Sequence, residues 1–133
     1  MTTIHGPLRI YKDIDFNFPK HPATFDVGKK VDINAVKQSI VTLVCTRFGE
    51  RPFQPDLGSL IMNMLFEPVD PITLAVMKSG IEQVIQNHEP RCVVQDIEIF
   101  NNNDSTALDI SIYFSVVGIA LPASFTFTLQ RLR

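Results

Sequence analysis

Three pairs of carboxylates lie close enough in the sequence for acid–base chemistry to be considered. They are Glu50 with Asp56, Glu67 with Asp70, and Glu82 with Glu89. Hydrolysis of a glycosidic bond needs only two such groups, flanking the bond that breaks. However, a chain with 14 acidic residues forms such pairs by chance, and it has no tryptophan and only two tyrosines to build a sugar-binding platform. Glycoside hydrolysis therefore stays an alternative, and we predict no catalytic residue.

Other residue types that carry chemistry are scattered along the chain. The histidines His5, His21 and His88 are far apart, and no GxSxG, HExxH, CxxC or phosphate-binding glycine loop occurs. Cys45 and Cys92 sit in apolar segments without CxxC spacing, which is typical of buried free thiols. A small-ligand-binding domain is a third possibility, but no polar groups converge on an apolar pocket pattern. We therefore predict no metal and no cofactor.

The composition is that of one soluble globular domain of 133 residues, 45% hydrophobic and 20% charged. A net charge of -2 gives no basic footprint for nucleic acid. No window is as apolar as a membrane span, and the N-terminus lacks the apolar core of a signal peptide. These features predict a protein that stays in the cytoplasm where it is made, without a nucleic-acid or membrane partner.

The stretch "TRFGERPFQPDLGS", Thr46 to Ser59, contains two prolines and two glycines between helix-like segments. Loops of this length are uncommon in compact domains unless they are functional or packed. From its residues alone three interpretations stay open: an active site, a ligand cradle or a docking surface for another protein.

The elements that must position these residues follow from the periodicity. Asp32 as N-cap starts a helix to about Cys45, a short helical run follows Ser59, and Asp70 with Pro71 starts the longest helix, to about Asn87. The apolar stripe of the longest helix is Leu74, Met77, Ile81, Val84, Ile85 and His88.

After Pro90 the period changes to two, which predicts strands over 92–100, 107–116 and 124–132 with a turn at "NNNDS". We therefore expect one α+β domain over 1–133, with helices packed on one face of a small antiparallel C-terminal sheet. It divides into an irregular N-terminal arm (1–31), a helical part (32–90) and antiparallel strands (91–133).

A three-stranded meander has two edges that accept another strand unless they are covered. The segment "DIDFNF", Asp13 to Phe18, alternates like a short half-buried strand and is one candidate to cover an edge. The other edge is a candidate site for strand addition by a partner, and loops that blunt it are the alternative.

The segment "NHEPR" places Glu89 just beyond the end of the longest helix, because a residue before proline leaves the helical region. A carboxylate there faces the negative end of the helix dipole, which is disfavoured by about 0.3–1 kcal/mol. Compensation within the chain by Arg91, Arg47 or Arg51 is one interpretation. Outward pairing of Glu89 and Arg91 with a partner is the other.

Four motifs occur in the order found in one family: "DID" (Asp13 to Asp15), "TRFGERPFQPDLGS", "LFEP" (Leu65 to Pro68) and "EPR" (Glu89 to Arg91). In these the chain resembles the small baseplate-wedge, or sheath-initiator, family of contractile phage tails and related injection systems. The resemblance runs from about Tyr11 to the last strand. The sequence departs from the pattern at Phe48, where lysine is common, and at His88, where an aromatic ring is usual.

The resemblance implies a structural protein of the virion tail baseplate, assembled in the bacterial host cytoplasm, and not an enzyme, although the family has carried a lysozyme-like label. It implies contact of Glu89, Pro90 and Arg91 with a helical core bundle of the larger wedge subunits, so that Glu89 becomes a docking charge. It also implies that the C-terminal sheet templates the first ring of tail sheath subunits, with tail tube or hub proteins as further neighbours. The loop is then a docking element, for which we predict ionic contacts by Arg47, Glu50 and Arg51 and an anchor at Phe53.

Overall fold

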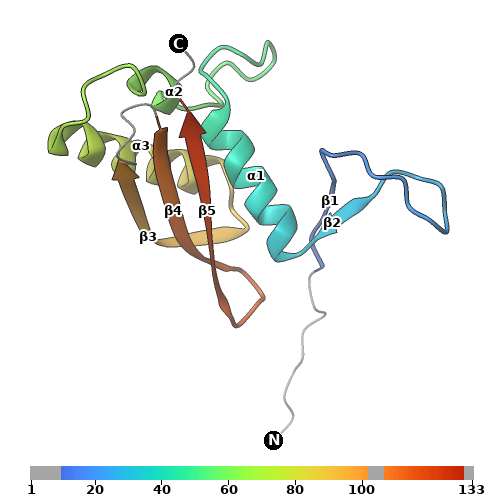
Figure 1. The fold of residues 1–133 in the computed structure, drawn as a ribbon. Coiled ribbons are helices and arrows are strands. Elements are labelled where there is room, and N and C mark those ends of the chain that lie inside the picture. The colour runs from blue at the N-terminus through green and yellow to red at the C-terminus, as the bar shows by residue number, and fades with distance from the viewer. Residues whose placement is uncertain (1–9, 102–106, 131–133) are drawn as a thin grey trace, which may run out of the picture.

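The computed structural model describes residues 10–101 and 107–130. The elements are β1 (Lys12–Ile14), β2 (Lys29–Val31), α1 (Ile33–Cys45), α2 (Ile61–Met64), α3 (Pro71–His88), β3 (Cys92–Asn101), β4 (Ala107–Val116) and β5 (Pro122–Gln130). α1 lies between the C-terminal sheet and the arm that carries β1 and β2 (Figure 1). The predicted α+β class is confirmed.

The two long helices begin and end within about a residue of their predicted bounds. Pro71 opens α3 with a fixed backbone angle and no N–H to satisfy. Asp32 and Asp70 stand at the N-cap positions, as predicted, but neither side chain makes a capping hydrogen bond. Asp32 has a positive φ of 52° and its Oδ1 accepts a hydrogen bond from the backbone N–H of Tyr11 instead. The short run after Ser59 is only the single turn of α2.

The C-terminal sheet has the strand order β3-β4-β5, and both pairs are antiparallel, as predicted. The register of β4 with β5 is continuous, whereas that of β3 with β4 shifts between Val94 and Asp96. Apart from Asn101, which ends β3, the predicted turn lies outside the described residues, as do positions 131 and 132 of the third predicted strand.

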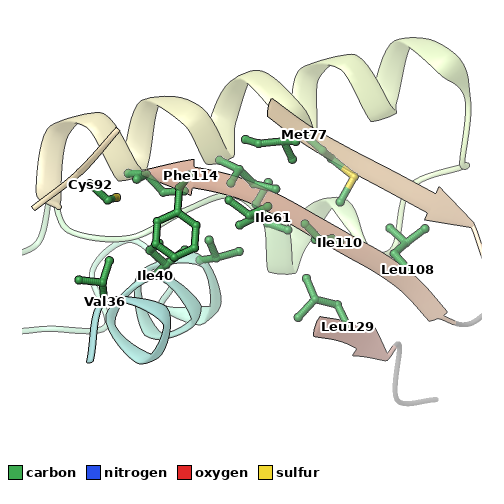
Figure 2. Close-up of a cluster of buried hydrophobic side chains, with 14 of the residues drawn as sticks. Val36, Ile40, Ile61, Met77, Cys92, Leu108, Ile110, Phe114 and Leu129 are labelled. Carbon is green, nitrogen blue, oxygen red and sulfur yellow. The ribbon is translucent and has the colours of Figure 1, made fainter. Parts of the chain in front are cut away.

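The core forms where α1, α2 and α3 cover one face of this sheet (Figure 2). The predicted inward residues of the central strand are all buried: Leu108, Ile110, Ile112, Phe114 and Val116. Phe114 is fully buried and meets Phe125 edge-on, with ring centroids 5.9 Å apart. Their counterparts on α3 are Met77, Ile81, Val84 and Ile85, which confirms the middle of the predicted stripe, whereas Leu74 and His88 at its ends are half-buried.

The N-terminal arm is more regular than predicted. β1 pairs with β2 in an antiparallel ribbon and not with the C-terminal sheet. The predicted half-buried strand over 13–18 is wrong beyond Ile14, because Asp15 starts a turn in which its side chain accepts the N–H of Asn17. Ile14, Phe16 and Phe18 are 56%, 57% and 67% exposed. The arm therefore presents apolar side chains outward.

Candidate protein-docking site

Glu89 and Arg91 lie at the corner where α3 ends and β3 begins. Arg91 Nε donates to Glu89 Oε1 at 2.6 Å and Nη2 donates to Oε2 at 2.9 Å, the two-bond geometry of a strong guanidinium–carboxylate pair. The Glu89 side chain is only 3% exposed. Arg91 is thus the compensating partner, and neither Arg47 nor Arg51 is. Glu89 is not an unpaired outward charge, which corrects that expectation, while contact of the motif with a partner stays a prediction.

The electrostatics of the corner favour the charged pair. Burial by itself raises the pKa of Glu89, but hydrogen bonds from Arg91 and Ser39 outweigh it, so the pKa lies below the ordinary value of 4.5. The hydrogen bond to Glu89 raises the pKa of Arg91. Both groups are charged at neutral pH, and Arg91 offsets the unfavourable helix dipole at Glu89.

Arg91 also connects this corner to the arm. Its Nη1 donates to Asp13 Oδ2 of β1 at 3.0 Å, and its guanidinium lies 5.7 Å from the centre of the Tyr11 ring. The Tyr11 hydroxyl donates to the carbonyl of Val117 at 3.1 Å, beyond the end of β4. Asp13 lies in the "DID" motif, so the sequence marked it, but no role was predicted for it.

Gln38 of α1 holds the other side of β1. Its side-chain Nε2 donates to the carbonyl of Ile14 at 2.7 Å, and its Oε1 accepts the backbone N–H of Phe16 at 3.3 Å. The amide therefore takes the place of a peptide group on a neighbouring strand. The sequence contains no signal for this role, since Gln38 is one polar residue of an amphipathic helix.

The loop from Thr46 to Ser59 is closed by its own backbone. Ser59 N donates to Thr46 O at 2.8 Å, and Gly49 N donates to Pro55 O at 3.0 Å. Gly58 has a φ of 149°, and a Cβ there would lie 2.7 Å from the carbonyl carbon of Arg47. Only glycine therefore fits where the two ends of the loop come together. The two ends of the loop therefore meet, while residues 47–56 between them are exposed.

The four residues predicted for docking on this loop are dispersed. Glu50 Oε2 accepts the backbone N–H of Arg47 at 2.9 Å, and both residues line a hollow beside Cys45. Phe53 is 98% exposed. Of the four, only Arg51 lines the same groove as residues of the arm and His88 at the end of α3.

These segments enclose a groove of about 500 Å³, which we call the docking groove. It is lined by Lys12, Asp13, Ile14, Phe16, Gln38, Ser39, Thr42, Leu43, Arg51, Leu57 and His88. The groove therefore joins the "DID" motif and the loop from Thr46 to Ser59 to the end of α3, directly before the "EPR" motif. Glu89 and Arg91 adjoin it through Ser39 and Asp13, while Pro90 is exposed at the corner. The groove lining includes Ile14 and Phe16, whose apolar side chains are exposed. Exposed apolar side chains beside charged residues are typical of a protein-binding surface.

Three of the six candidate catalytic carboxylates are engaged in structural contacts. Glu50 accepts a backbone N–H, Glu82 accepts Nε2 of Gln86 at 3.1 Å, and Glu89 is paired with Arg91. A glycosidase acid needs a raised pKa, whereas that of Glu89 is lowered.

Cys45 and Cys92 are both free, as predicted. Cys92 is buried, and this burial raises its pKa to about 12. Cys45 is only half-buried, so the prediction of full burial is wrong for it. Within 10–101 and 107–130, no cluster of three or more His, Cys, Asp or Glu is arranged to hold a metal ion. No helix in those ranges is long and apolar enough to span a bilayer.

Comparison with known proteins points to one family. The family model described as baseplate wedge protein gp25 matches residues 31–119. Baseplate wedge protein gp25 of Enterobacteria phage T4 is 31% identical over 109 residues, which cover 82% of this chain and 82% of the phage protein.

Solved structures share the fold. A chain in the 6-fold symmetrised cryo-EM structure of the anti-feeding prophage baseplate is 27% identical, with a TM-score of 0.71 over 84% of this chain and 89% of that chain. A Geobacter sulfurreducens protein named a tail lysozyme has a TM-score of 0.67 over 74% of this chain and 89% of that chain. It is only 20% identical, so this likeness concerns the fold alone.

Proposed function

The chain belongs to the gp25 family of baseplate wedge proteins, structural components of contractile tails, and we propose that its docking groove clasps a helical core bundle of the larger wedge subunits. We propose also that its C-terminal sheet templates the sheath by strand addition, and that it assembles in the host cytoplasm without enzymatic activity. The observation that carries the clasp is the Arg91 network, which joins the arm to the end of α3 beside a groove that Arg51 and Leu57 of the loop also line.

The composition of the docking groove supports a helical occupant. Amphipathic helices bind in grooves through apolar anchors spaced along one face. Ile14 and Phe16 offer exposed apolar surface for such anchors, and Lys12 and Arg51 add positive charge beside it. A helix with an apolar stripe and acidic flanks fits this combination.

In this proposal Glu89 and Arg91 act mainly by positioning. Arg91 fixes β1 through Asp13, so loss of Arg91 disturbs the wall of the groove as well as any direct contact. Binding variants are therefore better placed on the exposed wall than in the buried pair.

The test is co-purification of tagged full-length chain with the wedge subunits from cells that make the whole particle. Ile14→Asp puts a charge on the apolar wall, and we expect it to remove the wedge subunits from the purified material. Ile72→Asp is the matched control, because Ile72 is also exposed and lies about 24 Å along α3 from His88. Equal recovery of wedge subunits with both variants contradicts the proposed clasp.

For sheath templating, β5 is the better suited of the two sheet edges. Among the described residues β3 and β5 each pair with β4 alone. The register of β5 is unbroken, whereas β3 has an irregularity at Val94/Asp96, and Asp96 is bonded to Lys78 of α3 at 2.6 Å. Irregular edges resist further pairing, so we assign the templating edge to β5.

Lysines on an edge strand discourage strand addition, which gives a matched pair of variants. We expect Ser124→Lys with Thr126→Lys on β5 to block sheath assembly on purified baseplates, as seen by electron microscopy. Val93→Lys with Gln95→Lys on β3 is the control and leaves sheath growth unchanged. Loss of sheath only with the β3 variant reverses the edge assignment, and normal sheath with both variants refutes templating.

A further inference from the structure

A second groove, of about 760 Å³, lies between the arm and α1 and shares Phe16, Gln38 and Thr42 with the docking groove. Its charged residues are Lys29, Lys30, Lys37 and Asp15. Three lysines and one aspartate give a local charge of +2, on a chain whose net charge is -2. The groove is therefore a positive site on an acidic protein.

The positive charge is only partly neutralised within the described chain. Lys30 Nζ lies 3.7 Å from Asp15 Oδ1, a long contact for an ion pair. Lys37 Nζ lies 6.0 Å from the centre of the Phe125 ring, and Lys29 has no ionic partner among the described residues. Two lysines are thus available to carboxylates of a partner.

One wall of the groove is a strand with an unpaired edge. In the β1–β2 ribbon, Asp32 N donates to Tyr11 O and Asp15 N donates to Gly28 O. Because hydrogen-bonded pairs alternate in an antiparallel ribbon, the backbone groups of Lys29 and Val31 point away from β1. The outer edge of β1 is occupied by Gln38, but the outer edge of β2 has no equivalent partner among the described residues.

Apolar side chains lie among the lysines. Phe16 is 57% exposed and Val31 is 41% exposed, and both line the groove. A segment that pairs with β2 presents its side chains alternately to the two faces of the ribbon. Lys29 and Val31 are two residues apart and lie on the same face of β2, so the matching segment carries an acidic and an apolar side chain two positions apart on that face.

We propose that this groove binds an acidic segment of a partner protein, which adds to β2 as an extended strand. The carboxylates of the segment lie near Lys29 and Lys37, and its apolar side chains pack on Phe16 and Val31. This inference goes beyond the proposed function, since it requires neither a helix in the docking groove nor a strand on β5.

The probe is a fluorescein-labelled heptapeptide in which glutamate and valine take turns at every second position with serine between them, titrated with the full-length chain at low ionic strength. We expect saturable binding that weakens with added salt. Lys29→Glu and Lys37→Glu each weaken binding about tenfold, because each replaces an attraction with a repulsion. Lys20→Glu, on the same arm but outside the groove, makes the same charge change and leaves the affinity within about twofold.

Three results overturn the proposal. One is no saturable binding of the glutamate–valine peptide, or binding that Lys29→Glu and Lys37→Glu leave unchanged. Another is equal affinity for a single-stranded oligonucleotide of the same length, which identifies a general polyanion surface. The third is concentration-dependent dimerisation of the chain that Lys29→Glu abolishes, which identifies a second copy as the occupant. Unchanged far-ultraviolet circular dichroism of each variant shows that its fold is intact.

Discussion

Replacement of Arg91 by methionine tests the role of the Glu89–Arg91 pair most sharply. Methionine keeps much of the volume of arginine but removes both side-chain hydrogen bonds to Glu89 and the one to Asp13. Glu89 is 3% exposed and is then left as a buried carboxylate without its cation. Breaking a buried pair in this way destabilises a protein by about 3–5 kcal/mol. A domain of this size is stable by about 5–15 kcal/mol, so the variant loses a large part of its stability.

The pH dependence separates this mechanism from simple loss of packing. In the wild type the pKa of Glu89 is lowered in the folded state, so its contribution is present above 4.5 and is lost as the pH falls through the folded pKa. In Arg91→Met burial raises the folded pKa of Glu89 instead. The variant is then least destabilised near pH 4.5, and the stability difference from the wild type grows as the pH rises towards neutrality.

Urea denaturation followed by circular dichroism at several pH values between pH 4.5 and 7.5 measures this difference. The control is Glu89→Gln combined with Arg91→Met, which removes the charge together with its partner. We expect the double variant to recover part of the lost stability and to show no growth of the difference with pH. A loss for Arg91→Met that is constant with pH, or effects that simply add in the double variant, refutes the reasoning.

Two further predictions concern the loop and the cysteines. Gly58→Ala destabilises the chain by about 1–3 kcal/mol, because φ is 149° and the new Cβ meets the backbone of Arg47 at 2.7 Å. Gly80→Ala is the control and stabilises α3 by about 1 kcal/mol, because its Cβ meets only Ile61 Cδ1, at 3.8 Å. Urea denaturation measures the free energy of unfolding of both variants. The same change in that free energy for both variants contradicts the loop geometry. An aromatic disulfide reagent modifies Cys45 but not Cys92 in the folded chain at pH 8, because burial raises the pKa of Cys92 to about 12. Equal rates of modification of the two cysteines refute the burial of Cys92.

The helices and the C-terminal meander were predictable because their signals are local. Helical spacing in α1 and α3 and strict alternation in β4 reflect burial of one face within a short segment. The arm was not predictable in the same way. Ile14 and Phe16 alternate like buried strand residues but are exposed, since alternation alone does not show whether a face is covered.

The candidate site was predictable in its residues more than in its geometry. The position of Glu89 at the negative end of the helix dipole indicated that it needs a positively charged partner, and Arg91 was one of the three arginines predicted for that role. The bond from Arg91 to Asp13 joins residues 78 apart in sequence, and the support from Gln38 crosses from α1 to β1. Such contacts depend on the tertiary arrangement, which no local pattern encodes. The resemblance to the baseplate wedge family is confirmed by the family comparison, while the roles of individual residues in docking stay predictions.

The most direct measurement of the clasp is photo-cross-linking from inside the docking groove in assembled baseplates. A photoreactive amino acid replaces Ile14 in one strain and Ile72 in another, and the adducts are identified by mass spectrometry. The proposed function predicts that position 14 forms adducts with helical segments of the wedge subunits and that position 72 does not. Wedge adducts from position 72 alone, or none from position 14, would contradict it.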